Sequence, residues 1–117
     1  MDDDERTLGE QLAEWGKVAV IETTGRRTGA VVSTAVGFVE EPDGSLLVAA
    51  GNVAADWALN LQADPVCRVT IGEGTRTYRA RPADADESAR AVSALILKYG
   101  TPAERLGHGP VFRITPD

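Results

Sequence analysis

The sequence predicts a mainly β, α+β fold in which six mostly antiparallel strands form a compact barrel with flanking helices. Runs rich in Val, Ile and Thr alternate with short turns that contain Gly or Pro, a pattern typical of strands joined as hairpins. The chain has 117 residues, of which 43% are hydrophobic and 26% charged, enough for one domain with a buried core. We therefore expect a single domain over residues 1–117, with an acidic tail at residues 1–5.

The first expected elements are a helix and two strands. Thr7 and Glu10 have the T-x-x-E spacing of a capping box, and apolar residues follow at helical spacing, so a helix should begin there. The β-prone runs 17–24 and 30–41 predict two strands. The loop 25–29 between them is bounded by glycines and connects the strands.

The middle of the chain predicts two hairpins around a short helix. A Pro-Asp-Gly turn precedes residues 45–50, which should return antiparallel to the strand before them. Residues 54–63 then read as a helix that ends before Pro65, because the residue preceding proline disfavours helical geometry. Strands 66–71 and 75–82 flank a glycine-rich turn and form the second hairpin.

The last part of the chain predicts the longest helix and one more strand. Asp84 and Glu87 repeat the capping-box spacing, and Gly100 is a natural helix end. The expected apolar face of this helix consists of Ala89, Val92, Ile96 and Tyr99. Residues 110–115 read as the final strand.

Charge and cysteine content exclude several classes of function. The formal charge is −6, but four acidic residues lie at positions 2–5, and the rest of the chain carries 14 acidic and 12 basic residues. Such a nearly neutral body does not attract nucleic acid or an anionic membrane surface. The single cysteine, Cys67, permits no internal disulfide, and the acidic start does not resemble a signal peptide. We expect a soluble, cytoplasmic protein without an integral membrane segment.

Side-chain chemistry alone offers no catalytic centre. Nucleophilic catalysis needs a base beside the nucleophile, but the single histidine, His108, lies between two glycines, and Cys67 lies within a predicted strand. No His, Asp or Glu residues have metal-ligand spacing, so no metal site is predicted. If the chain is an enzyme, a bound organic cofactor must supply the reactive atoms.

The loop after the first strand is a candidate anion site. Its glycines free the backbone to expose N–H groups, and Arg26, Arg27 and Thr28 add charged and neutral donors for a phosphate or carboxylate. The alternative is a polar hairpin turn whose arginines are merely solvated. The wrong glycine spacing and the absence of a lysine exclude a P-loop.

Two further groups of residues permit a binding or a structural interpretation. Trp57 and Asn60 lie three residues apart on nearly the same helical face, where they form either a wall for a planar ligand or part of the core. Four strand arginines either bind an anionic tail or pair with acids at a rim, which we favour; they are Arg68, Arg76, Arg79 and Arg81.

Taken together, these segments resemble the deazaflavin-dependent nitroreductase family, the split-barrel oxidoreductases of actinobacteria that use coenzyme F-420. Residues 23–29 (TTGRRTG) match T-x-G-[RK]-[RKS]-[ST]-G, and residues 57–65 (WALNLQADP) match W-x-x-N-L-x-A-[ND]-P. Residues 110–116 (PVFRITP) resemble the last strand of the family. The resemblance covers residues 18–116 and implies a six-stranded split β-barrel of the FMN-binding type, with the deazaflavin in a groove.

The resemblance also implies roles for particular residues. Arg26, Arg27 and Thr28 would hold the phosphate and glutamate tail of the coenzyme. Tyr99 is the aromatic hydroxyl expected near a substrate. Other residues would line the coenzyme, pass close to its ring or close the site; they are Val32, Ser33, Thr34, Ala35, Val36, Gly37, Ala49, Ala50, Gly51, Asn52, Asp56, Trp57, Ala58, Leu59 and Asn60. Hydride transfer from a deazaflavin needs orientation more than a side-chain nucleophile.

The expected function is hydride transfer from reduced coenzyme F-420 to an electron-poor small molecule such as a quinone, an enone or a nitro compound. Two alternatives stay open: an FMN-binding oxidoreductase, and a non-redox protein that binds a lipid or another small molecule on the same fold. The second follows from Val32 and Ala35, where family members usually carry arginine and proline. Split-barrel relatives often dimerise, and exposed strand edges favour association with a second chain, so both a monomer and a homodimer stay open.

Overall fold

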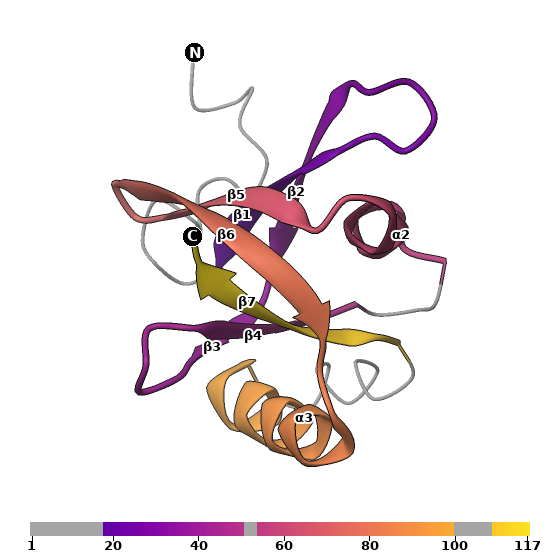
Figure 1. Cartoon of the computed structure of the whole chain (residues 1–117). Coiled ribbons are helices and arrows are strands. Elements are labelled where there is room, and N and C mark those ends of the chain that lie inside the picture. The colour runs from indigo at the N-terminus through magenta and orange to yellow at the C-terminus, as the bar shows by residue number, and fades with distance from the viewer. Residues whose placement is uncertain (1–17, 51–53, 100–108) are drawn as a thin grey trace.

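The computed structural model describes residues 18–50, 54–99 and 109–117. Within these residues the chain forms one curled sheet of seven strands and two helices (Figure 1). The elements are β1 (Ala19–Thr24), β2 (Val31–Val36), β3 (Phe38–Glu40), β4 (Leu46–Ala49), α2 (Asp56–Ala63), β5 (Val66–Ile71), β6 (Gly74–Pro82), α3 (Ala85–Tyr99) and β7 (Val111–Pro116). The expected helix at Thr7 and Glu10 and the expected helix end at Gly100 lie outside the described residues.

The strand order, β2-β1-β5-β6-β7-β4-β3, explains why the sheet curls. All neighbouring strands are antiparallel. The two edge strands, β2 and β3, are consecutive in the chain and only Gly37 separates them. Because this short segment joins the two edges of the sheet, the edges must lie close together in space. The sheet therefore has to curl. The expected fold class, a mostly antiparallel split barrel with flanking helices, is confirmed.

The expected number of six strands is wrong, because the run 30–41 does not form one strand. The chain changes partner at Gly37, since β2 pairs with β1 and β3 pairs with β4 at the far end of the order. The C-terminal part of α3 packs against this point. A Cβ atom at Gly37 would lie 3.1 Å from Tyr99 Cε2 and 3.3 Å from Leu95 Cδ2, so a larger residue there would push against the helix.

The predicted hairpins are confirmed. β3 and β4 are joined by the Pro42-Asp43-Gly44 turn, in which Gly44 has a φ of 88°. β5 and β6 are joined at Gly72, with a φ of 59°. Both angles lie in the left-handed region that glycine adopts without steric cost, so these two glycines fix where each hairpin turns.

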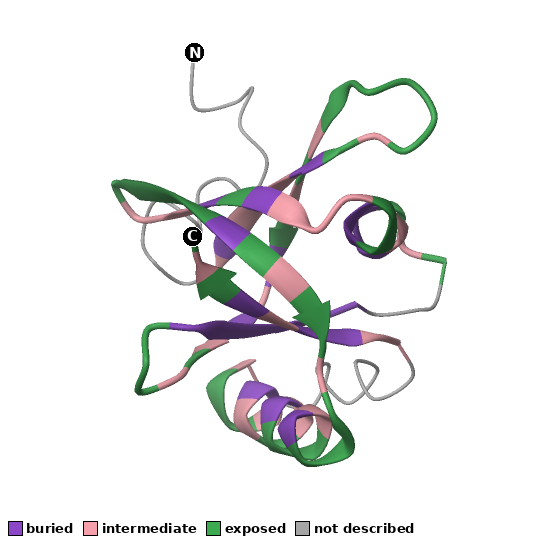
Figure 2. Ribbon diagram, in the orientation of Figure 1, coloured by how far each residue is buried: buried purple, intermediate pink, exposed green. Residues whose placement is uncertain are grey.

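Two hydrophobic clusters hold the elements together. The main core lies inside the curled sheet, where α2 packs against β1 and β2 and Trp57 contacts Phe112 with ring centroids 5.9 Å apart. The second cluster lies between α3 and the outer face of β4 and β7, and Figure 2 shows the buried side of α3 turned toward the sheet. Its buried members are Leu47, Ala49, Ala91, Leu95 and Val111.

The start of α3 has the predicted capping box. The Glu87 backbone N–H donates to Asp84 Oδ1 at 2.8 Å, and the Asp84 N–H donates to Glu87 Oε1 at 3.0 Å. The buried face of α3 differs from the expected apolar face. Ala89 is exposed, and the buried residues are Glu87, Ala91 and Leu95. Glu87 is buried despite its charge because arginines of the sheet neutralise it.

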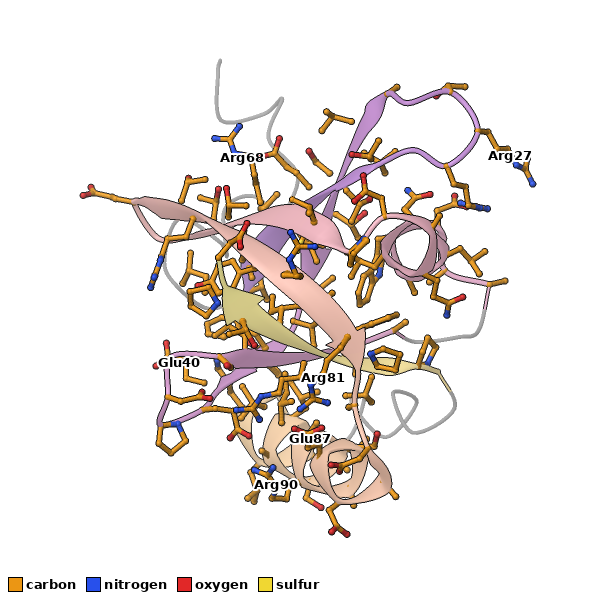
Figure 3. All side chains as sticks on the ribbon, viewed as in Figure 1. Arg27, Glu40, Arg68, Arg81, Glu87 and Arg90 are labelled. Atoms are coloured by element: carbon orange, nitrogen blue, oxygen red, sulfur yellow. The ribbon has the colours of Figure 1, made fainter. Side chains whose placement is uncertain are left out.

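Arg113 on β7 is the centre of an ionic cluster that ties α3 to the sheet. Its guanidinium contacts Glu41 at 3.1 Å, Glu87 at 3.0 Å and Asp43 at 2.7 Å. Arg81 makes two hydrogen bonds of 2.9 Å to Glu87, and Figure 3 shows these two side chains pointing toward one another. Hydrogen bonds, first from Arg81, lower the pKa of Glu87 to about 2. Arg81 therefore pairs with an acid, as we favoured for the four strand arginines. Arg68, Arg76 and Arg79 form no ion pair with any described residue.

Candidate functional site

The β1–β2 loop and the start of α2 form one pocket, which we call the loop pocket. Its volume is about 210 Å³, and its lining residues are Gly25, Arg26, Arg27, Thr28, Val32, Asp56 and Asn60. The two sequence motifs, which lie about 30 residues apart, thus meet in space. Figure 1 shows the loop extending beyond the body of the sheet on the same side as α2.

Both glycines of the loop are needed for its shape. The Gly25 N–H donates to Ala30 O at 2.7 Å, and the Gly29 N–H donates to Gly25 O at 2.8 Å. A Cβ atom at Gly25 would lie 2.8 Å from Ala30 O, closer than real Cβ atoms come. Gly29 has a φ of 76°, which disfavours any other residue. The loop is thus a narrow turn that holds the intervening arginines in place.

Asn60 connects this loop to α2 and β1. Its side chain is 2% exposed. Its Oδ1 accepts from the Arg26 backbone N–H at 3.2 Å and from Arg26 Nη1 at 2.8 Å. Its Nδ2 donates to Thr23 Oγ1 at 3.1 Å. A buried amide with all of these partners fixes the backbone and the guanidinium of Arg26 together.

The two arginines of the loop have different surroundings. The side chain of Arg26 is 25% exposed, and its Nη2 lies 3.3 Å from Asp56 Oδ1. Arg27 is exposed and forms no ion pair with any described residue. Figure 3 shows it at the outer edge of the loop, pointing away from the body of the protein. Arg26 is therefore fixed at the pocket wall, while no ion pair with a described residue holds the side chain of Arg27.

The predicted residues at 57–59 belong mainly to the core. Trp57 is 6% exposed and packs against Phe112, and Ala58 is fully buried. Leu59 is half-buried. Of the two interpretations of Trp57, this structure favours the core residue over the ligand wall.

The predicted residues of β2 and β4 do not line the loop pocket apart from Val32. Along β2, Ser33 and Ala35 are exposed, while Val36 is 7% exposed and part of the core. Thr34 and Gly37 are half-buried. Ala49 packs in the cluster beneath α3 and Ala50 in the main core. Gly51 and Asn52 lie outside the described residues, as does His108.

Tyr99, the expected substrate contact, lies at the bend between β2 and β3. The Phe38 backbone N–H donates to the Tyr99 hydroxyl at 3.4 Å, and the ring packs on Gly37. Tyr99 does not line the loop pocket.

Cys67 lies beneath a second hollow, where β1 and β5 separate beyond the pair Glu22–Arg68. The hollow has a volume of about 200 Å³. Cys67 is 2% exposed, and burial raises the pKa of its thiol to about 11. A thiol with this pKa is a poor nucleophile at neutral pH, so the prediction that Cys67 is an inert core residue is confirmed.

Thr23 is the residue of the site that the sequence did not assign. It is 1% exposed, and its hydroxyl accepts the hydrogen bond that fixes Asn60. A signal was present, because Thr23 is the first residue of the loop motif. Its hydroxyl also shares the buried face of β1 with Ala19 and Ile21, and a buried hydroxyl needs a polar partner.

Comparison with known families identifies one that covers most of the chain. The model described as F420H(2)-dependent quinone reductase matches residues 2–105. A search of the curated proteins found no match. No helix among the described residues combines the length and the apolar character that crossing a membrane demands.

Several solved structures share the fold. The structure of an F420-H2 dependent reductase (FDR-A) is 22% identical, with a TM-score of 0.70 over 85% of this chain and 94% of that chain. HutZ, the heme storage protein from Vibrio cholerae, is 17% identical, with a TM-score of 0.72 over 92% of this chain and 86% of that chain. A chain described as a domain-swapped dimer is 22% identical, with a TM-score of 0.70 over 97% and 98%. At these identities the likeness concerns the fold.

Proposed function

The chain belongs to the F420H(2)-dependent quinone reductase family, and from this premise we propose that it binds reduced coenzyme F-420 and passes a hydride to an electron-poor small molecule. A quinone is the first substrate class to test, followed by an enone and a nitro compound. The observation that carries the proposal is the loop pocket, whose lining residues include two arginines and a threonine beside the first residue of a helix.

The donor set of this pocket fits the anionic part of the coenzyme. Arg26 and Arg27 provide charged donors suited to phosphate and carboxylate, and Thr28 provides a hydroxyl. Asp56 is the first residue of α2, so the positive end of the helix dipole also faces the pocket. A volume of about 210 Å³ is below the roughly 300–1,000 Å³ of sites for drug-sized ligands. The pocket is thus suited to the phosphate and glutamate tail rather than to the ring.

In the proposal, the residues of this chain bind and orient the coenzyme. Bound deazaflavin supplies the hydride, so the protein needs no nucleophile of its own. Arg26, fixed by Asn60, sets the position of the tail, and the exposed Arg27 closes over it. Val32, the second residue of β2, is half-buried at the pocket wall and would lie between the tail and the ring.

A matched pair of arginine variants tests this proposal. We expect Arg27→Ala to weaken binding of oxidised coenzyme F-420 by at least about tenfold, since a charge-assisted hydrogen bond contributes roughly 1.5–3 kcal/mol. Fluorescence titration of the purified protein measures the affinity. Arg90→Ala is the control, because Arg90 is an exposed arginine of α3 on the opposite side of the molecule from Arg27 (Figure 3). Equal affinity of Arg27→Ala and wild-type protein would refute the role of the loop.

We also propose a homodimer in the cytoplasm. One structure with this fold is described as a domain-swapped dimer, and β2 is an edge strand whose Val31 is 66% exposed. Unpaired strand edges of this kind favour association with a second chain. Sedimentation velocity of the full chain should give the mass of two chains; a single-chain mass at micromolar concentration would contradict the dimer.

A further inference from the structure

Asp56 is out of place in a pocket that binds an anion. Among the described residues that line the loop pocket, it alone carries negative charge, beside the positive Arg26 and Arg27. Its Oδ1 lies 3.3 Å from Arg26 Nη2. The carboxylate therefore contacts the same guanidinium that would receive a phosphate or carboxylate of the ligand.

The two partners of this ion pair are held very differently. Arg26 is anchored by two hydrogen bonds to Asn60, which is itself buried and bonded to Thr23. Asp56, in contrast, has a side chain that is 77% exposed. An ion pair this exposed contributes little to stability, because water solvates the released carboxylate. The guanidinium therefore stays at the pocket wall when the carboxylate leaves.

We infer that Asp56 is an internal competitor for the anion site. In the ligand-free chain its carboxylate occupies Nη2 of Arg26, and the anionic tail displaces it on binding. This role rests on the proposed function and concerns the regulation of the same site. Asp56 weakens coenzyme binding and speeds its release. The effect is limited to ligands that carry the charged tail.

Rapid release fits the chemistry of the proposed reaction. In the proposed reaction the coenzyme binds in its reduced form and leaves in its oxidised form, as a second substrate would. A carboxylate that takes over Arg26 as the tail departs replaces one charge-assisted contact with another. After the exchange, the guanidinium of Arg26 therefore still has an anionic partner.

The test compares wild type, Asp56→Asn and Asp86→Asn. Asp86 is the matched control, because it is an exposed aspartate in the first turn of the other helix and lies outside the loop pocket. Both variants lose one negative charge and one favourable interaction with a helix dipole. The probes are oxidised coenzyme F-420, the same deazaflavin without its phosphate and glutamate tail, and inorganic pyrophosphate.

We expect Asp56→Asn to bind coenzyme F-420 and pyrophosphate roughly threefold to tenfold more tightly than wild type at low salt, and less so in 0.5 M salt. The tail-free deazaflavin should bind both proteins alike, and Asp86→Asn should behave as wild type. Unchanged or weaker binding of both anions to Asp56→Asn would overturn the inference, because Asp56 would then merely orient Arg26.

The same titrations separate this inference from the proposed function. Tighter pyrophosphate binding by Asp56→Asn, with coenzyme F-420 bound by neither protein, would support the competitor and refute the coenzyme. Coenzyme F-420 binding that is equal in both proteins would keep the proposed function and refute the competitor. Absence of binding for every probe would refute both.

Discussion

Replacement of Asn60 by leucine should be the most damaging single change at the loop pocket. Asn60→Leu keeps the branching at Cγ but removes the acceptor for two hydrogen bonds from Arg26 and the donor to Thr23. A neutral hydrogen bond contributes about 0.5–1.5 kcal/mol and one from a charged group about 1.5–3 kcal/mol. The side chain is 2% exposed, so leucine recovers part of this by burial. We expect a net loss of about 2–4 kcal/mol in the free energy of unfolding.

Urea unfolding followed by tryptophan fluorescence measures this loss. Gln62→Leu is the control, since Gln62 is an exposed amide on the same helix, and its replacement should change stability by less than about 0.5 kcal/mol. A Thr23→Val and Asn60→Leu double variant should lose less than the two single variants combined, because removing both partners of the Asn60–Thr23 hydrogen bond leaves neither of them buried and unpaired. Equal stability of Asn60→Leu and Gln62→Leu would refute the argument that Asn60 fixes the loop.

Three further predictions follow from the rest of the fold. The pKa values of Glu87 and Asp43 are lowered to about 2 from 4.5 and 3.8, so both carboxylates stabilise the fold at pH values above their unfolded pKa values. Urea unfolding at a series of pH values should therefore show that stability is lost as the pH falls from about 5 to 2. The Glu87→Gln variant should show a weaker dependence of stability on pH. Gly37→Ala should lower the free energy of unfolding by about 1–2 kcal/mol because its Cβ would meet Tyr99, and Tyr99→Leu should restore part of that loss. With a thiol pKa of about 11, roughly one part in a thousand of Cys67 is thiolate at pH 8. A chromogenic disulfide reagent should therefore label Cys67 only as fast as the chain unfolds. Fast labelling of the native chain would contradict its burial.

Much of the fold could be predicted because its signals are local. The capping box at Asp84 and Glu87 and the turns at Gly44 and Gly72 each depend on a few adjacent residues, and the structure forms them as predicted. The break at Gly37 could not be predicted in this way. The run 30–41 has β propensity throughout, and only the separate partners of its two halves divide it.

The orientation of α3 needed information that is not local. A buried helical face that is predicted from hydropathy leaves out glutamate. Glu87 is nevertheless buried, because Arg81 and Arg113 lie opposite it on the sheet. The contribution of Asn60 is similar. Its spacing from Trp57 indicated a shared face, but its bonds to Arg26 and Thr23 join segments more than 30 residues apart.

A comparative titration tests the proposal that this chain binds coenzyme F-420. Purified wild-type protein is titrated with oxidised coenzyme F-420, with FMN and with a fluorescent fatty acid under the same conditions. We expect micromolar or tighter binding of coenzyme F-420, with FMN and the fatty acid bound more weakly. Binding of FMN or of the fatty acid in preference to coenzyme F-420 would contradict it.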